Sequence, residues 1–234
     1  MGRSVLVTGG ARGIGLAVAR ELAAAGDAVT VTHRGGDPPG DLTAVPCDVT
    51  REDDVRAAFL RVARSQGPVE VLVANAGVTR HGPLALSGDD SAGVVADTNL
   101  GGVIRVARYA VRGMMRMRRG RIVLMSSAAA WRGMAGQAVY AATKAGLVGF
   151  GRSLAREVAP LGVTVNIVAP GFIDVGMTAA MPPAQRDEAL AAVPLGRYGT
   201  AEEVAKVVRF LAGEDASYLT GAVIPVDGGF GMGH

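Results

Sequence analysis

Short runs of β-branched residues alternate along the chain with longer segments in which apolar residues recur every three or four positions. The short runs predict buried strands, and the longer segments predict helices with one apolar side. The predicted strands cover 4–8, 28–32, 43–46, 69–74, 121–126, 163–168 and 222–226, and the predicted helices cover 14–25, 51–66, 98–118, 138–159 and 201–212.

This alternation predicts an α/β protein with a doubly wound parallel sheet of about seven strands and helices on both faces, as in a Rossmann fold. No repeat, low-complexity tract or linker interrupts residues 1–234, so we expect a single domain. The longest stretch without clear periodicity is 171–200, and a loop of that length is usually functional, for example as a lid over a site.

The composition narrows the class of protein. Aromatic residues make up only 4% of the chain, so the hydrophobic 49% is mostly Ala, Val, Leu and Ile, as a core of strands and helices requires. Cys47, the single cysteine, cannot form an internal disulfide, and the N-terminus shows no signal sequence, so we expect a cytoplasmic protein. No run of eighteen apolar residues predicts a membrane span. The net charge of +3 is too small to indicate nucleic-acid binding.

A glycine-rich segment joins the first predicted strand to the first predicted helix. Its glycines follow a G-x-x-x-G-x-G spacing, and backbone N–H groups at such a junction, together with the helix dipole, bind phosphate groups. We therefore predict a dinucleotide site here; the alternative is a glycine turn without a ligand. The predicted contacts are Gly9, Gly10, Ala11, Arg12, Gly13, Ile14 and Gly15.

The end of the second predicted strand indicates which dinucleotide binds. NAD-binding units place a carboxylate there to hold the ribose 2′-hydroxyl, whereas an arginine accommodates a 2′-phosphate. Here Arg34 follows the strand and no carboxylate precedes Asp37. Arg34, with Arg12 from the glycine loop, therefore predicts NADP(H). The alternative is that Arg34 is solvated and that Asp37 reaches the ribose.

The remaining motifs carry a family resemblance. In order after the glycine loop they are Asp48-Val49, Asn75-Ala76-Gly77, Asn99, Ser127, Tyr140-Ala-Ala-Thr-Lys144 and Pro170-Gly171. Over essentially its whole length the chain resembles the classical short-chain dehydrogenase/reductases. Its segments 137–140 and 222–234 look most like the 3-oxoacyl-(acyl-carrier-protein) reductases of high-GC bacteria.

The resemblance implies a cofactor half of about 1–100, a catalytic and substrate half of about 101–234, and a homotetramer. It implies that Asn99 holds a water that relays protons to Lys144, and it implies no metal. The residues it implies for NADP(H), beyond the glycine loop and Arg34, are Asp48, Val49, Asn75, Ala76, Gly77, Tyr140, Lys144, Pro170, Gly171 and Ile173.

The chemistry of the catalytic set follows from the spacing. Tyr140 and Lys144 are four residues apart and share one helix face, so an ammonium beside the phenol should lower the pKa of Tyr140 and tune it as a general acid. Ser127 lies just past a strand end, where its hydroxyl can stabilise a developing alkoxide; strand alternation points Ser126, the alternative, to the other side. With the resemblance, this predicts hydride delivery from NADPH to a 3-oxo carbon while Tyr140 protonates the oxygen.

The chain departs from the family pattern in the loop after Asn75-Ala76-Gly77 and in the segment after Pro170-Gly171, where Gly176 also stands in the usual place of an aspartate. The substrate-side loop at 78–87 differs, and Val175 stands where the family usually has a threonine whose hydroxyl helps hold the nicotinamide end. The missing hydrogen bond should weaken cofactor binding by about 0.5–1.5 kcal/mol, unless Thr178 replaces it. Trp131 is a candidate wall of the acyl pocket; the alternative is a packing or interface residue.

Seven arginines, which we call the arginine stripe, and no acidic residue lie between positions 101 and 121. Arg105, Arg108, Arg112 and Arg116 share one helical face. Acyl carrier proteins present an acidic helix, so we predict that Arg112, Arg116, Arg118 and Arg119 dock one. The alternative is a solvated face whose charges suit the C-terminus of a helix.

Two other functions remain open at this point. One is a reductase or dehydrogenase of the same fold that acts on a free alcohol, sugar or steroid ketone, outside fatty-acid or polyketide synthesis. The other is a catalytically silent protein whose arginine stripe binds nucleic acid, which the intact Ser127, Tyr140 and Lys144 argue against.

Overall fold

A computed structural model describes residues 2–36, 38–175 and 183–232. Within these ranges all seven strands form one parallel sheet in the order β3-β2-β1-β4-β5-β6-β7, which confirms the predicted doubly wound Rossmann fold. The strands are β1 (Ser4–Thr8), β2 (Ala28–His33), β3 (Thr43–Pro46), β4 (Val71–Ala74), β5 (Gly120–Met125), β6 (Val163–Pro170) and β7 (Val223–Val226).

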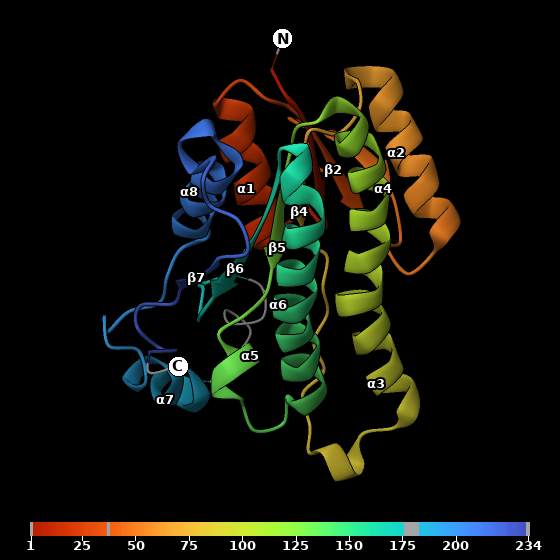
Figure 1. Cartoon of the computed structure of the whole chain (residues 1–234). Coiled ribbons are helices and arrows are strands. Elements are labelled where there is room, and N and C mark those ends of the chain that lie inside the picture. Colours follow the sequence, from red (N-terminus) through yellow and green to blue (C-terminus); the bar gives the residue numbers. More distant parts are fainter. Residues whose placement is uncertain (1, 37, 176–182, 233–234) are drawn as a thin grey trace.

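Helices cover both faces of the sheet (Figure 1). One face carries α1 (Gly13–Ala24) and α8 (Ala201–Ala212), and the other carries α2 (Glu52–Gln66), α4 (Gly102–Met117) and α6 (Ala138–Val158). The shorter elements are η1 (Leu84–Leu86), α3 (Asp89–Ala96), η2 (Asp97–Gly101), α5 (Ala129–Arg132), η3 (Ala159–Leu161), α7 (Pro183–Ala191) and η4 (Glu214–Ala216).

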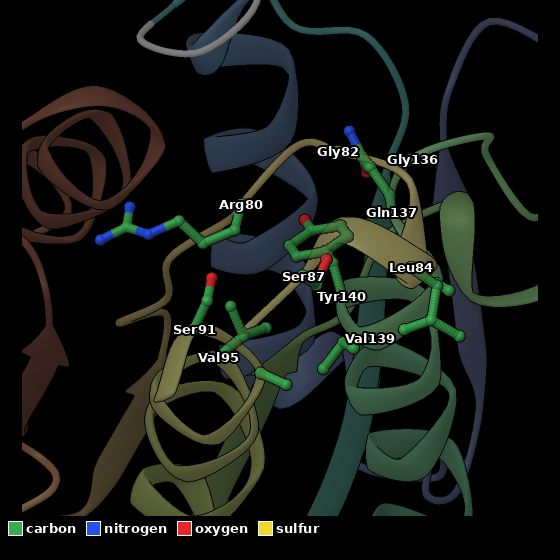
Figure 2. Close-up of a pocket in the computed structure, with 12 residues that line it drawn as sticks. Arg80, Gly82, Leu84, Ser87, Ser91, Val95, Gly136, Gln137, Val139 and Tyr140 are labelled. Atoms are coloured by element: carbon green, nitrogen blue, oxygen red, sulfur yellow. The ribbon is translucent and has the colours of Figure 1, made fainter. Parts of the chain in front are cut away.

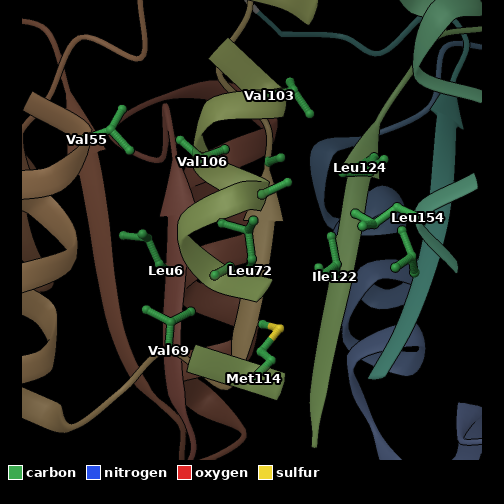
Figure 3. Close-up of a cluster of buried hydrophobic side chains, with 14 of the residues drawn as sticks. Leu6, Val55, Val69, Leu72, Val103, Val106, Met114, Ile122, Leu124 and Leu154 are labelled. Carbon is green, nitrogen blue, oxygen red and sulfur yellow. The ribbon is translucent and has the colours of Figure 1, made fainter. Parts of the chain in front are cut away.

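Each central strand contributes side chains to two separate hydrophobic cores, because successive side chains point to opposite faces of the sheet. In β1, Val5 and Val7 pack on the α1 and α8 side, while Leu6 packs on the α2, α4 and α6 side together with Leu72 and Ile122 (Figure 3). Full burial of one such side chain stabilises the fold by about 1.5–3 kcal/mol. The continuous apolar runs of the sequence are therefore strands covered on both sides.

The structure differs from the sequence prediction in two places that matter for the site. The stretch 171–200 is not all loop, because α7 forms in it from a segment with three Ala and one each of Gln, Arg, Glu and Leu, which favour helix. The helix predicted at 98–118 begins later, at Gly102, and is preceded by the π-helical turn η2, which contains Asn99. Such turns change the direction of side chains and are frequent at functional sites.

The strand order reverses between β1 and β4, so the adjacent carboxyl ends of these strands, Thr8 and Ala74, open a crevice that in such folds holds a ligand. The described ranges also lack two kinds of feature. They contain no helix with the length and apolar character that crossing a bilayer requires, and no group of three or more His, Cys, Asp or Glu side chains arranged to hold a metal ion.

Candidate active site

The glycine loop has the backbone that a close approach to a ligand requires. Gly9 and Gly13 have φ values of +63° and +56°, a region that favours glycine. A Cβ on Gly15 would lie 2.5 Å from both the Asn75 side-chain nitrogen and the Gly9 carbonyl oxygen, so no side chain fits there. The same Asn75 nitrogen donates to the carbonyls of Thr8 and Gly9, each at 3.1 Å. Asn75 therefore ties β4 to the loop.

The first turn of α1 has no capping group of its own. Arg12, at the N-cap, makes no side-chain capping bond, and no acidic residue lies in the first turn. The N–H groups at this end, with the helix dipole, form a site that suits an anion. This open helix start and the glycine cradle fit the pyrophosphate of a dinucleotide.

At the end of β2 the structure places His33 and then Arg34. Arg34 is exposed, and its guanidinium lies 4.0 Å from the carboxylate of Asp48. Burial alone would raise the pKa of Asp48, but hydrogen bonds from Thr50 and the charge of Arg34 outweigh it, and the net pKa is lowered. Asp48 is thus a fixed anion beside Arg34. Asp37, the alternative ribose ligand, lies outside the described residues.

The Ser127 hydroxyl lies close enough to the Tyr140 phenol for a hydrogen bond from it to lower the pKa of Tyr140. Burial raises the pKa of Tyr140, and the bond to Ser127 opposes that rise only in part. The expected lowering of this pKa is therefore wrong. A raised pKa keeps the phenol protonated at neutral pH, which is the state of a proton donor. Ser126 bonds instead to the Lys144 carbonyl at 2.8 Å, on the opposite side of the chain.

Lys144 is 5% exposed, and its ammonium makes a hydrogen bond to the backbone of β5. Its Nζ donates to the Met125 carbonyl at 2.7 Å and lies 5.7 Å from the centre of the Tyr140 ring. The spacing of the two residues does bring them together, but Lys144 is directed past Tyr140 toward β5. Burial lowers the pKa of Lys144 to about 8.

Asn99 is fully buried, and its amide holds the chain after β4 from two directions. Val78 N donates to Asn99 Oδ1 and Asn99 Nδ2 donates to the Val78 carbonyl, both at 2.8 Å. A further bond runs to Thr143 Oγ1 at 3.3 Å. A Cβ on Gly77 would lie 3.3 Å from Asn99 Oδ1 and 3.5 Å from Lys144 Nζ, so Gly77 lies between these two side chains. The proton-relay role of Asn99 stays a prediction.

A narrow pocket of about 20 Å³ opens beside Tyr140, with room for little more than one water molecule (Figure 2). Its walls are the chain from Arg80 to Ser87, one side of α3, and the turn that leads into α6. Sequence reasoning missed Gln137 and Arg80 as lining residues. The position of Gln137, three residues before Tyr140 on a helical pattern, is the signal that was available.

The chain after β6 reaches the cofactor loop only in part. Gly171 packs against Asp227, leaving no space for a Cβ, and Ile173 is buried in the α1 and α8 core, so neither offers a side chain to a ligand. Val175 Cγ2 would lie 3.9 Å from a Cβ on Gly13, so an apolar group faces the cradle there. Thr178, its possible replacement, lies outside the described residues. Trp131 lines a different cavity, with Val148 and Val223.

Four of the seven arginines of the arginine stripe form ion pairs with carboxylates in the folded chain. Arg105, Arg108, Arg119 and Arg121 pair with Asp97, Glu52, Glu70 and Glu214 respectively. Within the described residues, Arg112, Arg116 and Arg118 have no carboxylate partner; Arg112 lies 5.6 Å from the Tyr109 ring centre, and Arg118 donates to the Pro160 carbonyl. The stripe is therefore less basic than the sequence suggested.

Comparisons with known proteins show the family to which the chain belongs. A family model described as enoyl-(acyl carrier protein) reductase matches residues 9–231. The 3-oxoacyl-[acyl-carrier-protein] reductase MabA of Mycobacterium tuberculosis is 53% identical over 232 residues, which covers 99% of this chain and 94% of that protein. MabA of Mycobacterium avium is 52% identical, covering 99% and 91%. The 3-oxoacyl-[acyl-carrier-protein] reductase FabG of Escherichia coli is 43% identical, covering 99% and 98%. With matches of this extent, the chain belongs to the short-chain dehydrogenase/reductase family.

Proposed function

We propose that this protein is an NADPH-dependent reductase that converts 3-oxoacyl thioesters on an acyl carrier protein to 3-hydroxyacyl thioesters. The observation that carries the proposal is the proximity of the Ser127 hydroxyl to Tyr140, which lines the pocket, in a chain about half identical to 3-oxoacyl reductases. Two hydroxyls side by side can both donate to one carbonyl oxygen, which suits reduction of a ketone.

The roles of the protein groups follow from their surroundings. A bound nicotinamide supplies the hydride. In this proposal the glycine loop and the start of α1 hold the phosphates, and Lys144, beside Tyr140, bonds a ribose hydroxyl. Ser127 stabilises negative charge on the substrate oxygen, and Tyr140, whose pKa burial raises, donates the proton that completes the alcohol.

Replacement of Tyr140 by Phe tests this assignment. The change removes the proton donor and keeps the ring, so kcat on 3-oxobutanoyl coenzyme A should fall by about 10²–10⁴-fold while the Kd for NADPH stays within about twofold. Both are measured by NADPH absorbance and fluorescence. Parallel assays on a 2-enoyl thioester and on free ketones and sugars decide the substrate class; faster turnover of any of these would contradict the proposal.

The preference for NADPH rests on Arg34 and Arg12, both exposed at the adenosine end of the predicted site. Replacement of Arg34 by Ala should weaken NADPH binding about 10- to 100-fold, because hydrogen bonds to a charged phosphate contribute about 1.5–3 kcal/mol, and should leave NADH binding unchanged. Arg20, which is exposed on α1 and pairs with Asp41, provides the control substitution Arg20→Ala. Equal loss of NADPH and NADH binding would contradict a 2′-phosphate contact.

We further propose that Arg112, Arg116, Arg118 and Arg119 contact the acidic surface of the carrier protein. Support comes from the lack of carboxylate partners at the first three within the described residues; Arg119 would have to exchange Glu70 for the carrier. Replacing Arg112 and Arg116 by Glu should raise the KM for carrier-bound substrate on the order of tenfold at low salt, and less at high salt, with no change for the coenzyme A thioester. Arg61→Glu on the exposed side of α2 is the control. An equal rise for both substrates would argue against docking.

A homotetramer and a cytoplasmic location complete the proposal. β7 is an edge strand, and Phe210, Tyr218 and Leu219 expose apolar surface near it. An uncovered edge beside apolar side chains favours association with another copy. Light scattering should give about four times the chain mass of 23.8 kDa. A mass of one chain would exclude the tetramer.

A further inference from the structure

Arg132 is a charged residue that the mechanism above does not use. It is the last residue of α5, the four-residue helix that begins two residues after Ser127 at the carboxyl end of the sheet (Figure 1). Its Nη1 donates to the Phe230 carbonyl at 2.6 Å, and its guanidinium carbon lies 4.2 Å from the centre of the Phe230 ring. A hydrogen bond and a cation–π contact, which together we call the Arg132–Phe230 clasp, therefore join α5 to the C-terminal segment 227–232.

The orientation of the Ser127 hydroxyl depends on α5. Ala129 N donates to Ser127 Oγ at 3.2 Å, and Ala130 N donates to the Ser127 carbonyl at 2.9 Å. Because Ser127 Oγ accepts a hydrogen bond from the backbone of α5, its own proton is left to be donated to Tyr140 or to a substrate oxygen. A rotation of α5 would therefore displace the hydroxyl on which the proposed reaction depends.

A helix of one turn, such as α5, is not stable without contacts to the rest of the fold. At its start, Ala128 N donates to the Pro170 carbonyl at 2.9 Å, which fixes α5 to the end of β6. At its end, Gly133 turns the chain away with a φ of +69°, and the clasp supplies a hydrogen bond to the C-terminal segment. A Cβ on Gly231 would overlap Trp131 Nε1, so the backbone of that segment lies directly against α5.

The C-terminal segment that receives the clasp is itself held in place. Phe230 is 6% exposed, and its ring packs edge to face on Phe172 with the ring centres 4.8 Å apart. The Asp227 carboxylate accepts from Gly229 N at 2.9 Å and from Gly231 N at 2.8 Å, so the backbone is fixed on both sides of Phe230. The clasp therefore ties α5 to an ordered part of the fold.

We infer that Arg132 is a positioning residue, which holds α5 through Phe230 in the orientation that directs the Ser127 hydroxyl at the ketone oxygen. This inference rests on the proposed function. Arg132 acts through Ser127 and needs no contact with the substrate or the cofactor. Its loss should therefore slow the chemical step and leave the binding of both ligands unchanged.

The first test separates kcat from KM. Arg132→Met removes the guanidinium and keeps an unbranched side chain. Deletion of a donor to a developing oxyanion lowers kcat about 10²–10³-fold, and its displacement costs less, so kcat on 3-oxobutanoyl coenzyme A should fall about tenfold. The KM for this substrate and the Kd for NADPH should stay within about twofold. A higher KM with an unchanged kcat would indicate a substrate contact and overturn the inference.

Two further variants serve as a rescue and a control. Arg132→Lys keeps a cation that can donate to the Phe230 carbonyl and face its ring, so it should recover most of the lost kcat. Arg156→Met, at an exposed arginine on α6, should leave kcat as in the wild type. An equal fall of kcat in Arg132→Met and Arg156→Met would show a general effect of charge and overturn the inference.

Hydrogen exchange measures the order of α5 directly. In Arg132→Met the amides of residues 128–132 should exchange several-fold faster than in the wild type, while those of β5 and β6 should not change. Faster exchange of α5 with an unchanged kcat, or a lower kcat with unchanged exchange, would overturn the inference.

Folding and function are checked separately. Thermal unfolding and NADPH binding show whether the variants are folded. Loss of NADPH binding in Arg132→Met, or a fall of kcat in Arg132→Lys as large as in Arg132→Met, would overturn the positioning role. A wild type that does not reduce the thioester overturns the proposed function as well, whereas an active wild type with an unchanged kcat in Arg132→Met overturns only this inference.

Discussion

The helices α1 and α8 pack against each other on one face of the sheet. The N-terminus of α8 has a side-chain cap, whereas that of α1 has none. At α8, Thr200 Oγ1 accepts from Glu203 N at 3.2 Å, and Glu203 Oε2 accepts from Thr200 N at 2.9 Å. Glu203 also binds Arg197, and these bonds lower its pKa to about 2, so it stays charged. At α1 there is neither a capping side chain nor an acidic residue.

The start of α8 is arranged to stabilise the helix, and the start of α1 is arranged to bind an anion. A side-chain cap stabilises a helix by about 0.5–2 kcal/mol, and the chain forms one where nothing is to be bound. At α1 the same N–H groups are left for an anion, in a loop whose glycines admit its close approach. The open start of α1 points to a ligand site because it follows a loop whose glycines admit a close approach.

The two lysines differ in a comparable way, because one is buried and the other is exposed. They give the largest expected effect on stability. Burial lowers the pKa of Lys144 to about 8 from 10.5, whereas Lys206 is exposed on α8. Below pH 8, Lys144 is charged in the folded and unfolded states and its burial penalty is full. Between pH 8 and 10.5 the unfolded chain binds more protons, so the stability of the fold rises with pH, by about 3 kcal/mol in total.

Urea unfolding of the wild type and of Lys144→Met across this pH range measures that penalty. The variant lacks the buried amine, so the wild type should gain stability relative to it as the pH rises. Lys206→Met, the matched control, should follow the wild type. A pH-independent difference between wild type and Lys144→Met would show that Lys144 is not penalised by burial.

An acidic residue at the start of α1 should stabilise the helix and weaken the binding of an anion there. Ile14→Glu adds a carboxylate to the first turn of α1, and Ile14→Gln reproduces the lost packing without the charge. We expect Ile14→Glu to bind NADPH about tenfold more weakly than Ile14→Gln because like charges repel, yet to be more stable by about 0.3–1 kcal/mol through the helix dipole. Titration calorimetry and urea unfolding measure the two effects. Equal NADPH affinity in the two variants would remove the start of α1 from the site.

Local sequence rules predicted the strands and the glycine loop well. The apolar runs that became β1 and β4 are determined by burial on both faces, and the loop between β1 and α1 is determined by glycine spacing; both are short-range features. The i, i+4 spacing also brought Tyr140 and Lys144 together. These features need no knowledge of distant residues.

Features that depend on distant partners were not predicted. The direction of the Lys144 ammonium is set by the Met125 carbonyl on β5, and the raised pKa of Tyr140 is set by burial beneath the loop after β4. The arginine stripe appeared unbalanced because Glu52 and Glu70, which pair with it, come from elsewhere in the chain. The sequence shows charges, but only the fold shows which are paired.

The smallest expected effect is at the capped N-terminus of α8. Thr200→Ala removes the hydroxyl that accepts from Glu203 N, so the fold should lose about 1 kcal/mol in urea unfolding, whereas Thr200→Ser should lose almost nothing because it keeps the acceptor. NADPH affinity and kcat should not change in either variant, since this helix start is satisfied within the chain. If Thr200→Ala weakens NADPH binding as well, the two helix starts are coupled through the packing of α1 on α8, and capping at one of them is part of the binding site at the other.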